Sequence, residues 1–67
     1  MKADIVIIGG AGHIGLPLGI LFANKGKSVI LYDKDKKNID KINNSEMPFL
    51  EDDGERLLKK NKNKIFA

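Results

Sequence analysis

The fold is decided by residues 4–15, which read DIVIIGGAGHIG. Asp4 leads into the β-branched run Ile5–Ile8, and a run without polar alternation is typical of a strand buried on both faces in a parallel sheet. The residues that follow, 9–12, favour a turn, because glycine loses the most conformational freedom in a regular helix or strand. The stretch therefore predicts a buried strand that ends in a glycine-rich turn.

A helix is expected after this turn, over residues 13–25, because apolar residues recur there at helical spacing. Pro17 fits a helix only in the first turn, where a missing N–H group breaks no hydrogen bond, so the helix must begin within residues 12–15. Gly26 is a typical residue just beyond the C-terminal end of a helix. The turn and the helix start are thus predicted to coincide.

The rest of the chain alternates between strand and helix signals in the same way. Asp35 is a favourable N-cap, and the pair Asn43-Asn44 favours a helix end. The further elements expected are a buried strand over 28–32, a helix over 35–44, an extended connector over 47–50, a short helix over 51–60 and the opening of a strand over 65–67. The order β-α-β-α-(α)-β with parallel strands predicts an α/β fold, the N-terminal part of a Rossmann fold and an incomplete domain over residues 1–67.

The glycine-rich turn has the spacing Gly10-x-Gly12-x-x-Gly15, which between a strand and a helix is the pattern of dinucleotide-binding folds. In that pattern Gly10 allows the tight turn, Gly12 lets a pyrophosphate approach the backbone, and Gly15 lets the helix pack on the first strand. Free N–H groups around His13 and Ile14 then face the pyrophosphate at the positive end of the helix dipole. All five residues are candidate cofactor-binding residues.

Asp33 follows the second predicted strand and completes the set of candidate cofactor-binding residues. A carboxylate there accepts hydrogen bonds from the ribose hydroxyls of an adenosine and repels a 2′-phosphate, which favours NAD over NADP. Lys34, Lys36 and Lys37 follow closely and would weaken that repulsion. The predicted cofactor is NAD.

No candidate catalytic or metal-binding residue is found in the sequence. The chain has no cysteine and one histidine, so neither a disulfide nor a zinc site is expected. His13 is not expected to act as an acid or base, because hydride transfer takes place at the nicotinamide, far from the pyrophosphate. Asp52, Asp53 and Glu55 are interpreted as charges at the start of a helix.

Composition and charge exclude several classes of partner. The net charge is +3, and the basic residues within 59–64 are lysines interleaved with asparagine rather than with arginine or aromatic residues. We therefore expect a solvated surface there and no nucleic-acid partner.

Neither a signal peptide nor an apolar stretch long enough to span a bilayer is present, so we expect a cytoplasmic protein without membrane insertion.

The loop satisfies two family patterns. Counted from Gly9 it is GxxGxxG and resembles the nucleotide-sugar epimerases and dehydratases of the short-chain dehydrogenase/reductase class, although Ile8 stands where they usually carry threonine. Counted from Gly10 and continued through Leu16-Pro17-Leu18, it resembles the UDP-glucose/GDP-mannose dehydrogenase family of nucleotide-sugar dehydrogenases. The continuation favours the second resemblance.

This second resemblance covers nearly the whole chain. It is carried by residues 16–18, 29–33, 39–43, 46–51 and 57–58. Within the family, the chain resembles the UDP-N-acetylmannosamine dehydrogenase-like branch in the segments Gly-Gly-x-Gly-His and Met-Pro-Phe. The chain departs from the family at residues 51–54, where the family usually has Glu-Pro-Gly-Leu, and at Asn38, where a basic residue is common. No family contact is carried over to these two places.

The resemblance implies two successive NAD-dependent oxidations that convert a nucleotide sugar to its uronic acid through a cysteine nucleophile, a reaction of polysaccharide biosynthesis. The 67-residue chain, without cysteine, is then expected to be inactive alone and part of a larger homo-oligomeric enzyme. The unpaired edge of its first strand predicts self-association. Two alternatives remain: an epimerase or dehydratase, which a downstream Tyr-x-x-x-Lys motif would identify, and a non-catalytic basic binding module.

Overall fold

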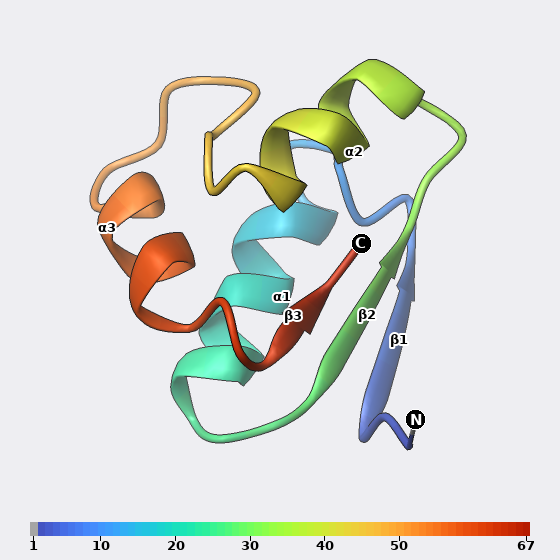
Figure 1. The fold of residues 1–67 in the computed structure, drawn as a ribbon, viewed down its shortest axis with the longest axis vertical. Helices are drawn as coiled ribbons and strands as arrows, with labels where there is room; N and C mark the ends of the chain where they lie inside the picture. Colours follow the sequence, from blue (N-terminus) through green and yellow to red (C-terminus); the bar gives the residue numbers. More distant parts are fainter. Residues whose placement is uncertain (1) are drawn as a thin grey trace.

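The computed structural model describes residues 2–67, which form a three-stranded sheet and three helices. In chain order the elements are β1 (Ile5–Ile8), α1 (Gly15–Asn24), β2 (Val29–Tyr32), α2 (Lys36–Asn43), α3 (Gly54–Lys60) and β3 (Ile65–Phe66). The strands are all parallel and lie in the order β1-β2-β3, with β2 in the centre (Figure 1). This arrangement confirms the predicted α/β fold and the N-terminal part of a Rossmann fold.

Both ends of α1 follow the local rules that predicted it. Pro17 is the third residue of the helix and so lies in its first turn. Just beyond the last turn, Gly26 has a φ of +92°, and the N–H of Lys27 reaches back to the carbonyl of Phe22. This is a Schellman ending, which favours glycine at the left-handed position.

One helix boundary differs from the prediction. α1 begins at Gly15, within the predicted range of residues 12–15, because the turn after β1 extends through Ile14. α3 begins at Gly54, three residues later than expected, because Asp53 has a φ of +58°, a left-handed conformation that a right-handed helix does not contain. α2 begins behind Asp35, whose side chain caps it as predicted.

The hydrophobic core lies between the sheet and the helices. Val29 and Leu31 of β2 are almost completely buried. Ile5 pairs with Val29 and Ile7 pairs with Leu31, so the four side chains share the face of the sheet that α1 covers. The other buried apolar residues are Ala11, Leu16, Ile20, Ala23, Ile42, Leu58 and Ile65.

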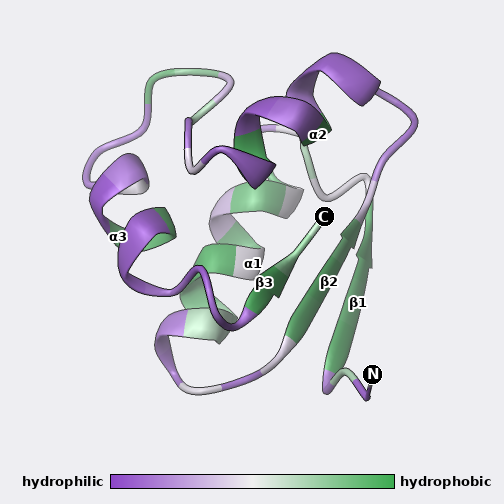
Figure 2. Cartoon of the chain, in the orientation of Figure 1, coloured by the Kyte–Doolittle hydropathy of each residue, from purple (hydrophilic) through white to green (hydrophobic). Residues whose placement is uncertain are grey.

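The opposite face of the sheet is open, which corrects the prediction that the first two strands are buried on both faces. Val6 and Ile8 of β1 are 57% and 76% exposed, and Tyr32 of β2 is 61% exposed. The helices gather on one side of the strands (Figure 1), because successive right-handed crossovers in the same direction place their helices on the same side. Figure 2 shows the strands as hydrophobic along their length. Within residues 2–67, no helix is long and apolar enough to cross a membrane.

Candidate cofactor-binding site

The glycine-rich loop joins the carboxyl end of β1 to the N-terminus of α1 and is tied to the end of β2. The N–H groups of Gly9 and Gly10 both donate to the carbonyl of Tyr32, at 2.8 and 3.0 Å, and the N–H of Gly12 donates to the carbonyl of Gly9 at 3.2 Å. Gly9 has a φ of +77°, whereas Gly10 is not in the left-handed region. The left-handed residue of the turn is therefore Gly9, which directly precedes Gly10.

The three glycines of the motif lack a side chain for different reasons. A Cβ on Gly10 would lie 2.7 Å from the Cβ of Leu31, and a Cβ on Gly15 would overlap the carbonyl oxygen of Gly9, so the fold excludes larger residues at both places. A Cβ on Gly12 would meet only the same carbonyl oxygen, at 3.4 Å, which is an ordinary van der Waals distance. The fold therefore leaves room for a side chain at Gly12.

The close approach of α1 to the sheet is made by a glycine outside the motif. A Cβ on the buried Gly19 would lie 2.7 Å from Cδ2 of Leu31 and 3.3 Å from Cδ1 of Ile7. Gly15 packs against the backbone of Gly9, directly after β1, so Gly19 adds a second close approach further along the helix. The sequence contained a signal that was missed, namely a glycine in the middle of an apolar helix.

Three backbone N–H groups at the start of α1 have no acceptor among the described residues. They belong to His13, Ile14 and Gly15. Ile14 is the N-cap without a side-chain hydrogen bond, and the first turn of the helix has no acidic residue. Unpaired N–H groups at the positive end of a helix dipole attract an anion. The start of α1 can therefore bind a phosphate group.

Asp33 lies beside the loop, just after β2. Its Oδ2 accepts the N–H of Ala11 at 3.0 Å, and its Oδ1 accepts the N–H of Asp35 at 2.9 Å. The bond from Asp35, the bond from Ala11 and the positive charge of Lys34 hold the pKa of the Asp33 carboxyl below its ordinary value. The ionised group keeps lone pairs for further donors. It can therefore hold the loop and accept hydrogen bonds from hydroxyl groups at the same time.

Two hollows meet at the loop. One, of about 450 Å³, is lined by Ile8, Gly9, Tyr32, Asp33 and Lys34. The other, of about 510 Å³, is lined by Ile7, Ile8, Gly9, Gly12, His13, Ile14, Gly15 and Leu18. They share Ile8 and Gly9, whereas Gly10 is buried. Free N–H donors, a carboxylate and apolar walls along one continuous surface fit a diphosphate flanked by a ribose.

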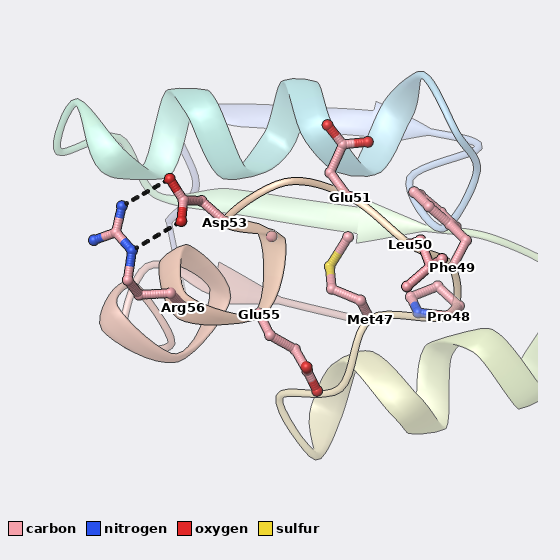
Figure 3. Close-up of a pocket in the computed structure, with 9 residues that line it drawn as sticks. Met47, Pro48, Phe49, Leu50, Glu51, Asp53, Glu55 and Arg56 are labelled. Carbon is pink, nitrogen blue, oxygen red and sulfur yellow. Dashed lines mark hydrogen bonds and ion pairs between the residues drawn. The ribbon is translucent and has the colours of Figure 1, made fainter.

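A further hollow lies between the connector and α3 (Figure 3). Arg56 in its lining pairs with Asp53 at 3.3 Å on the surface, and Figure 3 shows Glu51 and Glu55 pointing in opposite directions. In residues 2–67 no group of histidine, aspartate and glutamate side chains is arranged to hold a metal ion. The charges in this hollow therefore do not converge on one point.

The connector also contacts the glycine-rich loop. Phe49 stacks on His13, with ring centroids 4.1 Å apart and ring planes 19° apart. Phe49 is half-buried and packs against the core, whereas His13 is exposed. The sequence analysis did not predict this pair. The spacing of residues within the loop does not indicate which side chain of the connector will contact His13.

Comparison with known proteins gives a family match. The model of the UDP-glucose/GDP-mannose dehydrogenase family, NAD binding domain, matches residues 3–66. No match was found among curated proteins or among solved structures. The matched range includes every residue of the candidate site.

Proposed function

The chain belongs to the UDP-glucose/GDP-mannose dehydrogenase family through its NAD-binding domain, and from this premise we propose that residues 9–15 and Asp33 hold the adenosine diphosphate half of NAD. Gly12 would leave room for the diphosphate, the free N–H groups at the start of α1 would donate to it, and Asp33 would accept hydrogen bonds from the hydroxyl groups of the adenosine ribose. When bound, NAD supplies a hydride acceptor for the oxidation of an alcohol. The residues of this chain bind the cofactor and orient it.

The observation that supports this proposal best is the room at Gly12. The fold excludes a side chain at Gly10 and at Gly15, but not at Gly12, where a Cβ would meet an ordinary contact. The free N–H groups of His13 and Ile14 follow directly. A side chain at residue 12 would stand between these groups and an incoming phosphate. A glycine that the fold does not need, placed beside free donors, is expected where a diphosphate approaches the backbone closely.

We extend the proposal to the enzyme that this domain serves. It oxidises a nucleotide sugar at its primary alcohol, in two NAD-dependent steps, to the uronic acid. The support is the family match together with Leu16-Pro17-Leu18 after the loop, which favour this reaction over that of a short-chain epimerase or dehydratase. The 67 residues contain no cysteine, so the nucleophile of the reaction would come from elsewhere in the enzyme. A cytoplasmic location and homo-oligomeric assembly belong to the same proposal.

Binding of pieces of the cofactor tests the assignment to the adenosine half. Titration calorimetry of the chain compares NAD, ADP-ribose and nicotinamide mononucleotide. We expect NAD and ADP-ribose to bind with similar affinity and the mononucleotide not to bind, while NADP binds more weakly because its 2′-phosphate meets Asp33. Binding of the mononucleotide without binding of ADP-ribose would overturn the proposal.

A further inference from the structure

The turn that presents the free N–H groups is held by different groups on its two sides. Residues 9–11 donate their N–H groups to the carbonyl of Tyr32 and the carboxylate of Asp33. The N–H groups of residues 13–15 have no acceptor in the described part of the chain. This segment is held through its carbonyl groups, because Gly12 and Ile14 accept the N–H groups of Leu16 and Leu18 at 3.0 and 3.2 Å, and its own N–H groups stay free for a diphosphate.

A side-chain contact also holds this segment. Ile14 is 84% exposed and packs against little, and Gly15 has no side chain. The ring of His13, however, lies 4.1 Å from the ring of Phe49, which packs against the core. Figure 3 shows Phe49 at the end of the connector that lies close to the blue loop before α1. The stacked pair links the free part of the loop to the core.

From this geometry we infer that Phe49 is a positioning residue for the diphosphate of the dinucleotide and acts through His13. The stack restricts the rotation of the His13 side chain, and it thereby narrows the orientations of the backbone at residues 13 and 14. Donors that are already oriented lose less conformational freedom when an anion binds, which raises the affinity. The inference rests on the proposed function and adds the connector to the cofactor site.

Four single substitutions test whether NAD affinity depends on the stacking of the two rings. Phe49→Tyr and His13→Phe keep two stacked rings, whereas Phe49→Leu and His13→Ala remove the stack. NAD affinity is measured by calorimetry at a temperature where circular dichroism shows each variant folded. We expect the last two variants to bind NAD about three- to tenfold more weakly, the range for an aromatic pair, and the first two to bind it as the wild type does.

The double variant and a matched control complete the design. Phe49→Leu combined with His13→Ala should bind NAD no more weakly than either single variant, because the second change removes a contact that is already lost. Phe22 is the control, since it is also half-buried against the core but lies in α1 and not in the connector. Phe22→Leu should lower the melting temperature and leave the NAD affinity unchanged.

A measurement on the free chain distinguishes failure of this inference from failure of the proposed function. In NMR spectra the ring protons of His13 should be shifted upfield by the ring of Phe49, and the shift should vanish in Phe49→Leu whether or not NAD is present. Wild-type affinity in Phe49→Leu, or fully additive losses in the double variant, would overturn the positioning role and leave the NAD site intact. If the wild-type chain shows the ring shift but binds no NAD, the proposed function fails and this inference with it.

Discussion

The substitution Gly12→Ala adds one methyl group at a place where the fold has room for it. The new Cβ would meet the carbonyl oxygen of Gly9 at 3.4 Å, and Gly12 does not have a positive φ. At such a position alanine stabilises a protein by about 0.4–1 kcal/mol, because the unfolded chain has less freedom to lose. With a gain of about 0.5 kcal/mol in the free energy of unfolding, we expect the melting temperature to rise by about 2–4 °C.

The same methyl group should impair the cofactor site. It would occupy the surface that the diphosphate approaches and hold the anion away from the N–H groups of His13 and Ile14. A hydrogen bond to a charged group contributes about 1.5–3 kcal/mol, so the loss of one bond weakens NAD binding by about 10- to 100-fold. Calorimetric titration with NAD and thermal unfolding followed by circular dichroism give both quantities from one preparation.

Gly15→Ala is the matched control, because it adds the same methyl group three residues later. There the Cβ would overlap the carbonyl oxygen of Gly9, a backbone atom that cannot rotate away, so we expect a loss of stability of about 1–3 kcal/mol. Gly12→Ala would refute this explanation of the motif if it bound NAD as tightly as the wild type. A destabilisation as large as that of Gly15→Ala would refute it as well.

Three further predictions concern charge, backbone conformation and association. The lowered pKa of Asp33 means that its carboxylate stabilises the fold above the ordinary pKa of 3.8 and that this contribution is lost as the pH falls through the lowered value. Asp33→Asn should therefore flatten the dependence of the melting temperature on pH in the acid range, and an unchanged slope would contradict the carboxylate's role. Gly26→Ala, at a φ of +92°, should lower the free energy of unfolding by about 1 kcal/mol without changing NAD affinity. If thermal unfolding shows the variant to be as stable as the wild type, the alanine is not strained at this position. The open face around Val6, Ile8 and Tyr32, next to the unpaired edge of β1, should cause concentration-dependent self-association in sedimentation velocity that Ile8→Lys reduces; a monomer at every concentration would rule this out.

The parts of the fold that the sequence predicted are those set by neighbouring residues. Pro17 and Gly26 restrict where α1 begins and ends, because each residue limits its own backbone. Asp35 caps α2 with its own side chain. The sequence also predicted that Asp33 directly follows the second strand, as it does in the structure, where the bond from Ala11 joins it to the glycine-rich loop.

The parts that were missed depend on residues from distant segments. Whether a strand is covered on one face or two depends on where the helices lie, and the apolar run Ile5–Ile8 is the same in both cases. The contact of Gly19 with Leu31 and the stacking of Phe49 on His13 likewise join segments that only the folded chain brings together. Local patterns predict which elements form, but not which surfaces meet.

The central claim is that a diphosphate binds the free N–H groups at the start of α1. NMR titration of the 15N-labelled chain with NAD tests it most directly, because the amide signals of His13, Ile14 and Gly15 report on those groups one by one. We predict that these three signals shift most, that ADP-ribose reproduces the shifts, and that Gly12→Ala needs a much higher NAD concentration to reach the same shifts. The claim is contradicted if the three signals stay in place while the largest shifts occur elsewhere, for example in the hollow lined by residues 47–51 and 53–56.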